Sequence, residues 1–182
     1  YPVAIELRHR SWSDREQEVL DVLGAHGAAW VQIDEPKFRF SIRQDHLPNP
    51  GRLCYMRLHG RNAEKWWTHD HPDERYNYLY SPAEIDGFAD TVTRVRQLVQ
   101  NIYVFMNNHF AGKAVANAAA LRHALGQPVP GEYADEMLER YGFLRGIVAR
   151  AGPDSLFDGL EHEGGDRLGG DGTAEDAEPR EG

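Results

Sequence analysis

Four short runs of strand-forming residues constrain the fold of this chain most. Each run is apolar at its start and polar at its end. They are residues 3–7, 28–34, 53–60 and 102–108. Strands of a parallel sheet that is covered on both faces are apolar throughout, so polar residues gathered at strand ends mark the edge where α/β proteins bind ligands. The pattern predicts a parallel sheet with a ligand site at the carboxyl ends of its strands.

Helix signals lie between and after these runs. Capping-box patterns, helical stripes of apolar residues and terminating glycines indicate helices at about residues 13–24, 81–99, 112–125 and 134–141. Strand and helix therefore alternate four times, which is half of an eight-stranded β/α barrel of about 250 residues. Two interpretations compete, a small open α/β sheet and the C-terminal half of a barrel. The absence of an initiator Met before Tyr1 favours the second.

Charge divides the chain at about residue 150. Residues 151–182 hold ten Asp or Glu and two Arg, whereas residues 1–150 hold 19 acidic and 18 basic residues. The C-terminal segment also has too little apolar surface to offset the entropy of ordering it. We predict a folded unit over residues 1–150 and a disordered acidic Gly-rich tail over residues 151–182. The near-neutral body makes nucleic acid a less favoured partner.

Cysteine content and hydropathy indicate the compartment. The single Cys54 excludes a disulfide framework, and no run approaches the roughly 18 apolar residues that span a bilayer. We therefore expect a cytoplasmic protein without membrane contact. Residues 69–71, His-Asp-His, lack the spacing of a metal site, and no phosphate-cradling glycine loop is present. Neither a metal site nor a cofactor is predicted.

The third run carries the strongest candidate for an anion site. Arg57 and His59 lie two residues apart and so share a face of the strand, and Arg61 follows in the loop. Guanidinium groups suit carboxylate or phosphate, and an imidazole can carry protons near neutral pH.

The first and second runs supply acidic candidates. Glu6 and Arg8 share a face, with His9 at the following turn. They either hold a ligand or pair with each other to fix the packing. Asp34 ends the second run and is predicted to lie in the pocket as a general base, whereas Glu35 points the other way and is predicted to be structural.

The fourth run and an aromatic loop complete the candidate site. Asn107 and Asn108 precede a helix start, where amide groups suit a neutral or anionic oxygen ligand or serve turn chemistry. Tyr76 and Tyr78 lie in a loop of roughly 20 residues that is rich in aromatic side chains, including Trp66, Trp67 and Tyr80. Such a connection is expected to form an ordered lid or pocket wall.

Four segments together resemble one known family. They read ELRHRSW at residues 6–12, MRLHGRN at 56–62, RYNYLYS at 75–81 and FMNNHFAGKAVANA at 105–118. In order and spacing they are similar to the YecE-like family, domain of unknown function 72, over residues 1 to about 125. The resemblance implies a TIM-type (β/α)8 barrel, of which this chain would hold about strands five to eight, and an activity that is not settled.

The resemblance also implies a set of pocket residues. They are Glu6, Arg8, His9, Arg57, His59, Arg61, Tyr76, Tyr78, Asn107 and Asn108, with Asp34 at a position that matches more loosely. The leading hypothesis is a pocket at the C-terminal mouth of the barrel that binds a small anionic or polyhydroxylated ligand. If chemistry takes place, Glu6 or Asp34 would be the base and His59 the acid, which suits hydrolysis or proton abstraction.

Two alternatives from other classes stay open. The first is a metal-dependent nuclease or phosphoesterase, because several side chains are of metal-ligating types: Glu6, His9, Asp34, His59 and His109. The second is a non-enzymatic nucleic-acid or protein adaptor that uses the aromatic loop around Trp66 and Trp67 as its contact surface.

Overall fold

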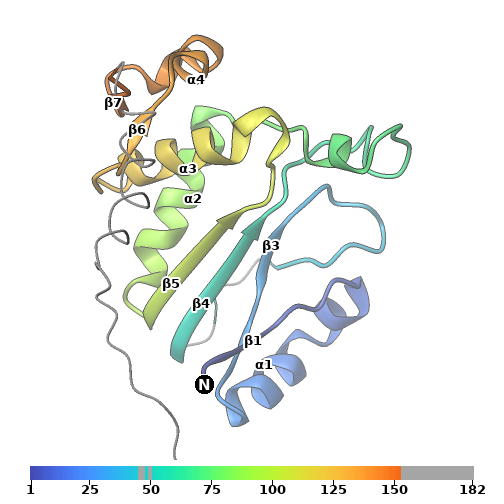
Figure 1. Cartoon of the computed structure of the whole chain (residues 1–182). Helices are drawn as coiled ribbons and strands as arrows, with labels where there is room; N and C mark the ends of the chain where they lie inside the picture. The colour runs from blue at the N-terminus through green and yellow to red at the C-terminus, as the bar shows by residue number, and fades with distance from the viewer. Residues whose placement is uncertain (45–47, 49–50, 153–182) are drawn as a thin grey trace, which may run out of the picture. The chain divides into compact units, whose positions relative to one another are not determined.

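Short parallel strands alternate with helices in the computed structural model, which describes residues 1–44, 48 and 51–152 (Figure 1). The strands are β1 (Val3–Ile5), β2 (Ala28–Trp30), β3 (Gln32–Asp34), β4 (Gly51–Leu58), β5 (Val99–Met106), β6 (Glu132–Tyr133) and β7 (Ala149–Arg150). The α-helices are α1 (Glu16–Ala25), α2 (Pro82–Val95), α3 (Lys113–Ala124) and α4 (Asp135–Arg140). Short 3-10 helices are η1 (Arg10–Arg15), η2 (Pro72–Tyr76), η3 (Phe110–Gly112) and η4 (Gly142–Leu144). The predicted tail lies outside the described residues except for Ala151 and Gly152, so its disorder stays a prediction.

All strand pairs are parallel. β1 pairs with β2, β3–β4–β5 form a three-stranded sheet, and β6 pairs with β7. Only Val31 separates β2 from β3. In the central sheet, Ile33 and Phe105 lie opposite Arg57 from either side. The carboxyl ends of β3, β4 and β5 therefore lie at one edge, as Figure 1 shows.

The predicted TIM-type (β/α)8 barrel is wrong. The described strands form separate sheets of two and three strands, and the described residues contain no closed barrel. Closure of such a barrel takes about eight strands with a consistent stagger. Alternating strands and helices also build open sheets, so the sequence pattern carried no information about closure. The assignment of strands five to eight falls with the barrel, and the open-sheet alternative agrees better with the structure.

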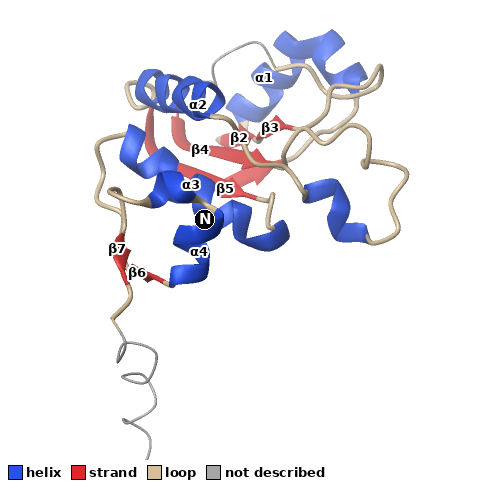
Figure 2. Cartoon of the chain, turned by 90° about the horizontal axis from the view of Figure 1, so that it is seen from above, coloured by secondary structure: helices blue, strands red, loops and turns tan. Residues whose placement is uncertain are grey.

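One face of the central sheet is buried under helices. Along β4 every second side chain is buried, namely Cys54, Met56 and Leu58. Cys54 and Met56 pack against Val92 and Val95 of α2, which lies alongside the strands (Figure 2). Burying side chains of this size supplies about 1.5 to 3 kcal/mol each. This helix-facing layer is the apolar core of the central sheet.

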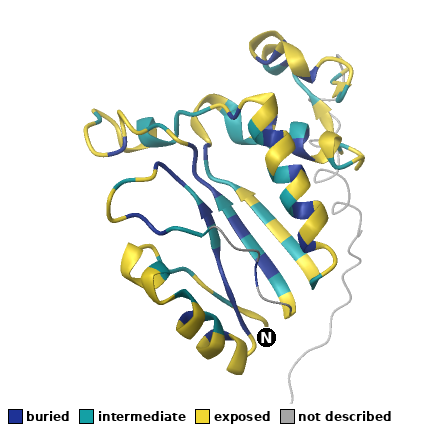
Figure 3. Ribbon diagram, turned by 180° about the vertical axis from the view of Figure 1, so that it is seen from behind, coloured by how far each residue is buried: buried dark blue, intermediate teal, exposed yellow. Residues whose placement is uncertain are grey.

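The opposite face of β4 and β5 is open. Tyr55 and Arg57 are half-buried, and Tyr103 and Phe105 of β5 are 50% and 44% exposed. Figure 3 shows the resulting alternation of exposed and partly buried residues along β5. We call this side of the two strands the open face.

The helix starts agree with the sequence in one case and differ in the other. At α2 the predicted capping box is confirmed, with Ser81 Oγ accepting from Glu84 N at 3.3 Å and Glu84 Oε2 accepting from Ser81 N at 2.8 Å. At α1 the predicted Ser13 cap does not form, because Ser13 lies within η1 and its Oγ accepts from Arg43 N at 2.7 Å. A tertiary contact has replaced the local cap.

None of the helices in the described part of the chain has both the length and the apolar character needed to cross a bilayer. The cytoplasmic location stays a prediction.

Candidate functional site

The carboxyl ends of four strands bring predicted site residues together. Backbone hydrogen bonds continue past the strand ends, from His59 N to Asp34 O at 2.9 Å and from Asn107 N to Leu58 O at 2.7 Å. Residues that are far apart in sequence therefore meet at one edge of the sheet.

Arg57 is the centre of the first group. Its Nη1 donates to Glu6 Oε2 at 2.7 Å and its Nε donates to Asn107 Oδ1 at 3.1 Å. Among the described residues its Nη2 has no hydrogen-bond partner. The expectation that Glu6, Arg57 and Asn107 converge is met, while their roles stay predictions. The held guanidinium keeps the two N–H groups of Nη2 for a ligand that enters beside it.

A cavity of about 440 Å³ lies beside this group on the open face, and we call it the open-face pocket. The rings of Tyr55 and Phe105 stack with their centroids 4.8 Å apart and form an apolar wall. The open-face pocket is lined by Pro2, Ala4, Glu6, Val31, Leu53, Tyr55, Arg57, Phe105 and Asn107. Aromatic walls with a few convergent polar groups are typical of small-molecule sites of this size.

Arg8 joins two carboxylates at the rim. Its Nη2 donates to Glu35 Oε2 at 2.5 Å, and its Nε lies 3.5 Å from Glu6 Oε1. Glu35 is only 6% exposed, and its predicted structural role stays a prediction. His9 is exposed, and its Nδ1 accepts from Ser11 N at the start of η1. With Arg57 included, the rim carries two guanidinium groups and two carboxylates and is electrically balanced.

Arg61 forms a second network with acidic partners. Its Nε and Nη2 donate to Asp34 at 3.0 and 2.7 Å, and its Nη1 donates to Glu84 at 2.8 Å. The hydroxyl of Tyr80 donates to Asp34 Oδ2 at 2.7 Å. The hydrogen bonds to Asp34 raise the pKa of the guanidinium. Arg61 and Asp34 are hydrogen-bonded to each other. The predicted role of Arg61 in anion binding and that of Asp34 as a base stay predictions.

His59 is almost completely buried, at 3% exposed. Its ring lies 6.4 Å from that of Trp66 and 6.0 Å from that of Tyr76, and neither of its nitrogens has a hydrogen-bond partner among the described residues. Burial, with the positive charges of Arg57 and Arg8, lowers its pKa to about 4. The imidazole is therefore neutral at pH 7 and has no proton to give as an imidazolium. Its predicted role as the acid stays untested.

The predicted tyrosines and asparagines mainly hold the loops. Asn108 is fully buried, and its Nδ2 donates to Tyr78 O and to Asn117 Oδ1, each at 2.8 Å. The hydroxyl of Tyr78 donates to Glu84 at 2.9 Å. Gly60 adopts φ +88°, and a Cβ added there would lie 2.6 Å from Tyr78 Cβ. The close packing of Tyr78 against the end of β4 therefore requires glycine at this position.

A second cavity, the loop pocket, has a volume of about 320 Å³. It lies between the loops that follow β3 and β4 and contains the predicted residue Tyr76. It is lined by Arg8, His9, Glu35, Phe40, Ser41, Trp66, Trp67, Arg75 and Tyr76. Trp66 is buried, whereas Trp67 is 62% exposed.

Sequence reasoning missed several residues of these networks. Glu84, which accepts from Arg61, and Phe40, which lines the loop pocket, are absent from the predicted site. The spacing of Phe38 and Phe40 could have signalled an aromatic face. The buried Asn117 had no signal, because an asparagine in a helix is usually exposed.

The metal-ligating side chains do not gather. Within the part of the chain that the structure describes, no three or more His, Cys, Asp or Glu side chains are placed to hold a metal ion. Asp34 bonds to Arg61 and Tyr80, and His109 lies 3.3 Å from Asp73. This geometry gives the metal-dependent alternative no support.

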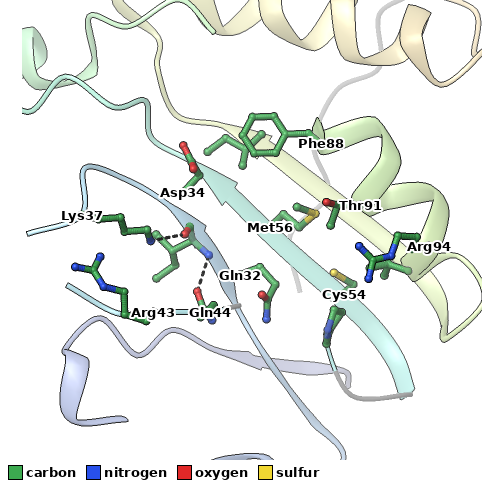
Figure 4. A pocket seen from close by; sticks show the side chains of 14 residues that line it. Gln32, Asp34, Lys37, Arg43, Gln44, Cys54, Met56, Phe88, Thr91 and Arg94 are labelled. Carbon is green, nitrogen blue, oxygen red and sulfur yellow. Dashed lines mark hydrogen bonds between the residues drawn. The ribbon is translucent and has the colours of Figure 1, made fainter. Parts of the chain in front are cut away.

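A third cavity of about 340 Å³ lies on the helix side of the sheet, between β3, β4 and α2 (Figure 4). Its polar groups are engaged locally, since Lys37 Nζ donates to Ile33 O at 3.1 Å and Gln44 Oε1 accepts from Ile33 N at 2.9 Å. Arg94 stands on α2, across the cavity from Lys37 and Arg43 in Figure 4. The cationic groups are spread around the cavity and do not converge on one point.

Comparison with known proteins places the chain among related sequences. A family described as "Protein of unknown function DUF72" matches residues 1–138. A DUF72 family protein from Thermotoga maritima MSB8 is similar in structure, with 37% identity, a TM-score of 0.61, and coverage of 70% of this chain and 47% of that chain.

Two crystal structures of a DUF72 family protein from Enterococcus faecalis V583 are also similar, each at 28% identity. One has a TM-score of 0.63, covering 72% of this chain and 51% of that chain. The other has a TM-score of 0.58, covering 69% and 49%. The chain thus spans about half the length of these solved structures. No curated protein matches it.

Proposed function

This chain belongs to the DUF72 family, and from that premise we propose that it binds a small anionic or polyhydroxylated ligand in the open-face pocket. The observation that carries the proposal is the bonding of Arg57 to Glu6 and to Asn107, from three different strand ends. These partners fix the guanidinium plane before any ligand arrives, which lowers the entropic cost of binding.

The donor and acceptor pattern defines the ligand class. Arg57 Nη2 is a donor without a partner among the described residues, and the Glu6 carboxylate has lone pairs to spare. An oxygen-rich molecule can accept from the first and donate to the second. The stacked rings of Tyr55 and Phe105 provide an apolar wall for its carbon skeleton.

Hydrolysis at this pocket would need a proton acceptor and a proton donor. Glu6 can accept a proton, but among the described residues that line the open-face pocket it is the only acid, and no histidine accompanies it. The proposal therefore stops at binding.

Thermal unfolding of the full chain tests the proposal. The probes are inorganic phosphate, citrate, sorbitol and glucose 6-phosphate. At tenfold excess over its Kd, a binding probe raises the Tm by about 3 to 6 °C. Arg57→Gln should abolish the shift, and Arg52→Gln, at the opposite, exposed end of β4, should keep it. A shift that survives Arg57→Gln, or no shift with any probe, contradicts the proposal.

A further inference from the structure

Two exposed aromatic rings that line the loop pocket, Phe40 and Trp67, are packed against a third ring, Phe38, which supports them. Phe38 and Phe40 stack with centroids 5.9 Å apart, and Trp67 lies 5.7 and 5.8 Å from them. We call these three residues the aromatic platform. Its rings come from two different loops, and Trp67 is 62% exposed while Phe40 is 49% exposed. Mutual ring contacts hold the platform in place while leaving ring surface open to a ligand.

Both donors and acceptors surround this platform. Glu35 is an acceptor held by Arg8 at 2.5 Å. Arg75 donates its Nε to Pro72 O at 3.0 Å, and its guanidinium carbon lies 5.8 Å from the centre of the Tyr76 ring. Among the described residues no partner is present for Arg75 Nη1. The pocket therefore combines the exposed surface of two mutually tilted rings, Phe40 and Trp67, with a carboxylate and guanidinium donors.

This combination suits a sugar ring better than other flat ligands. A sugar presents an apolar C–H face to aromatic rings, and its hydroxyls both donate and accept hydrogen bonds. A cationic ring would be repelled by Arg75, whose guanidinium has no carboxylate partner among the described residues. A purely anionic ring would find Arg8 already neutralised by Glu35.

One ion pair links the linings of the two pockets. Glu6 lines the open-face pocket, Arg8 lines the loop pocket, and Arg8 Nε lies 3.5 Å from Glu6 Oε1. A ligand in one pocket therefore borders on the other across a single ion pair.

We propose that the loop pocket is a second subsite that stacks a neutral sugar ring on the aromatic platform, so that the ligand is a carbohydrate of at least two sugar units. This inference rests on the proposed function of the open-face pocket. It specifies a carbohydrate as the ligand. It also orients the sugar chain, from Arg57 across the Glu6–Arg8 pair to Trp67.

Calorimetric titration of the full chain tests it with glucose, maltose, cellobiose and benzoate. At least one disaccharide should bind about tenfold more tightly than glucose, because a second ring gains the stacking surface. Trp67→Ala should remove that gain and leave glucose binding unchanged, while Trp67→Phe should keep part of it. Trp12→Ala is the matched control, since Trp12 is also an exposed tryptophan but does not line the loop pocket.

The outcomes separate this inference from the function on which it rests. Equal affinity for glucose and both disaccharides, or a gain that survives Trp67→Ala, overturns the subsite. Tighter binding of benzoate than of any sugar overturns the ligand class. If phosphate or citrate binds in an Arg57-dependent manner and no sugar binds, the subsite fails and the proposed function stands. If no probe of either experiment binds, both fail.

Discussion

The two faces of β4 contain neighbouring residues and have different physical roles. On the helix side Cys54, Met56 and Leu58 are at most 5% exposed and pack against helices. On the open face Tyr55 and Arg57 alternate with them, stay half-buried, and contact residues from other strands. A strand with period-two alternation can place stability on one face and recognition on the other.

The two faces of β4 should therefore differ in how well they tolerate substitutions. Apolar burial supplies most of the stabilisation of a fold, whereas partly exposed ion pairs supply little. The open face can therefore carry a charged site at small cost to the fold. Variants of matched residues on the two faces measure this separation directly.

The largest expected effect comes from matched leucines. Leu58→Ala on the buried face should lower the free energy of unfolding by about 3 to 4 kcal/mol, because it leaves a cavity among α2 and α3 side chains. Leu53→Ala on the open face should cost about 1 kcal/mol, since Leu53 is only half-buried. Urea unfolding measures both. Equal costs would mean that the open face is as well packed as the helix side.

His59 shares its strand face with Arg57 but is buried under Trp66 and Tyr76, which makes it an exception to the comparison. Its pKa is about 4 in the folded chain, against an unfolded value of 6.5. Between these values the unfolded state binds more protons, so stability falls as the pH falls from 6.5 towards 4, by on the order of 3 kcal/mol. Above pH 6.5 the imidazole is neutral in both the folded and the unfolded state, so His59 adds no further change of stability with pH.

The measurement is the pH dependence of urea unfolding for the wild type and for His59→Gln. The carboxylates titrate in both proteins, so the difference between the two curves isolates the imidazole. A flatter curve for His59→Gln is the expected result. Parallel curves would mean that His59 keeps an ordinary pKa and is not desolvated.

Two glycines at opposite ends of β4 give a smaller effect. Gly60→Ala should lower the free energy of unfolding by about 2 kcal/mol, because φ is +88° and the new Cβ meets Tyr78 Cβ. Gly51→Ala has no atom within 4 Å of its new Cβ, and it should change stability by less than about 0.5 kcal/mol. Thermal unfolding distinguishes them. A harmless Gly60→Ala would show that the loop of Tyr78 can move away, so that the open-face edge is less fixed than its contacts imply.

The sequence predicted the elements and which strand ends lie close together. Polar strand ends at Glu6, Arg57 and Asn107 indicated a common edge, because parallel strands align their carboxyl ends. Periodicity and capping residues located the helices, including the N-cap of α2 at Ser81. These features are local or repeat along the chain, so a single sequence contains them.

Contacts between distant parts of the chain could not be predicted in the same way. The alternation of strands and helices left the closure of the sheet open, and the barrel prediction failed there. The engagement of Arg61 by Asp34 and Glu84 and the burial of His59 depend on which loops meet. A charged residue looks the same in sequence whether its partner is a ligand or another side chain.

The residue with the largest expected effect on binding, Arg57, should have only a small effect on stability. Arg57 and Glu6 are 32% and 22% exposed, so water screens their ion pair, and Arg57→Gln should cost only about 1 kcal/mol of unfolding free energy. Arg52→Gln, at the exposed end of the same strand, should change it by less than about 0.5 kcal/mol. Urea unfolding at low salt and at 1 M NaCl tests the cause, because salt should shrink the Arg57 effect and leave the Leu58 effect unchanged. A loss at Arg57 as large as that at Leu58 would indicate that the open face is a second structural core, and the separation between the two faces of β4 would not hold.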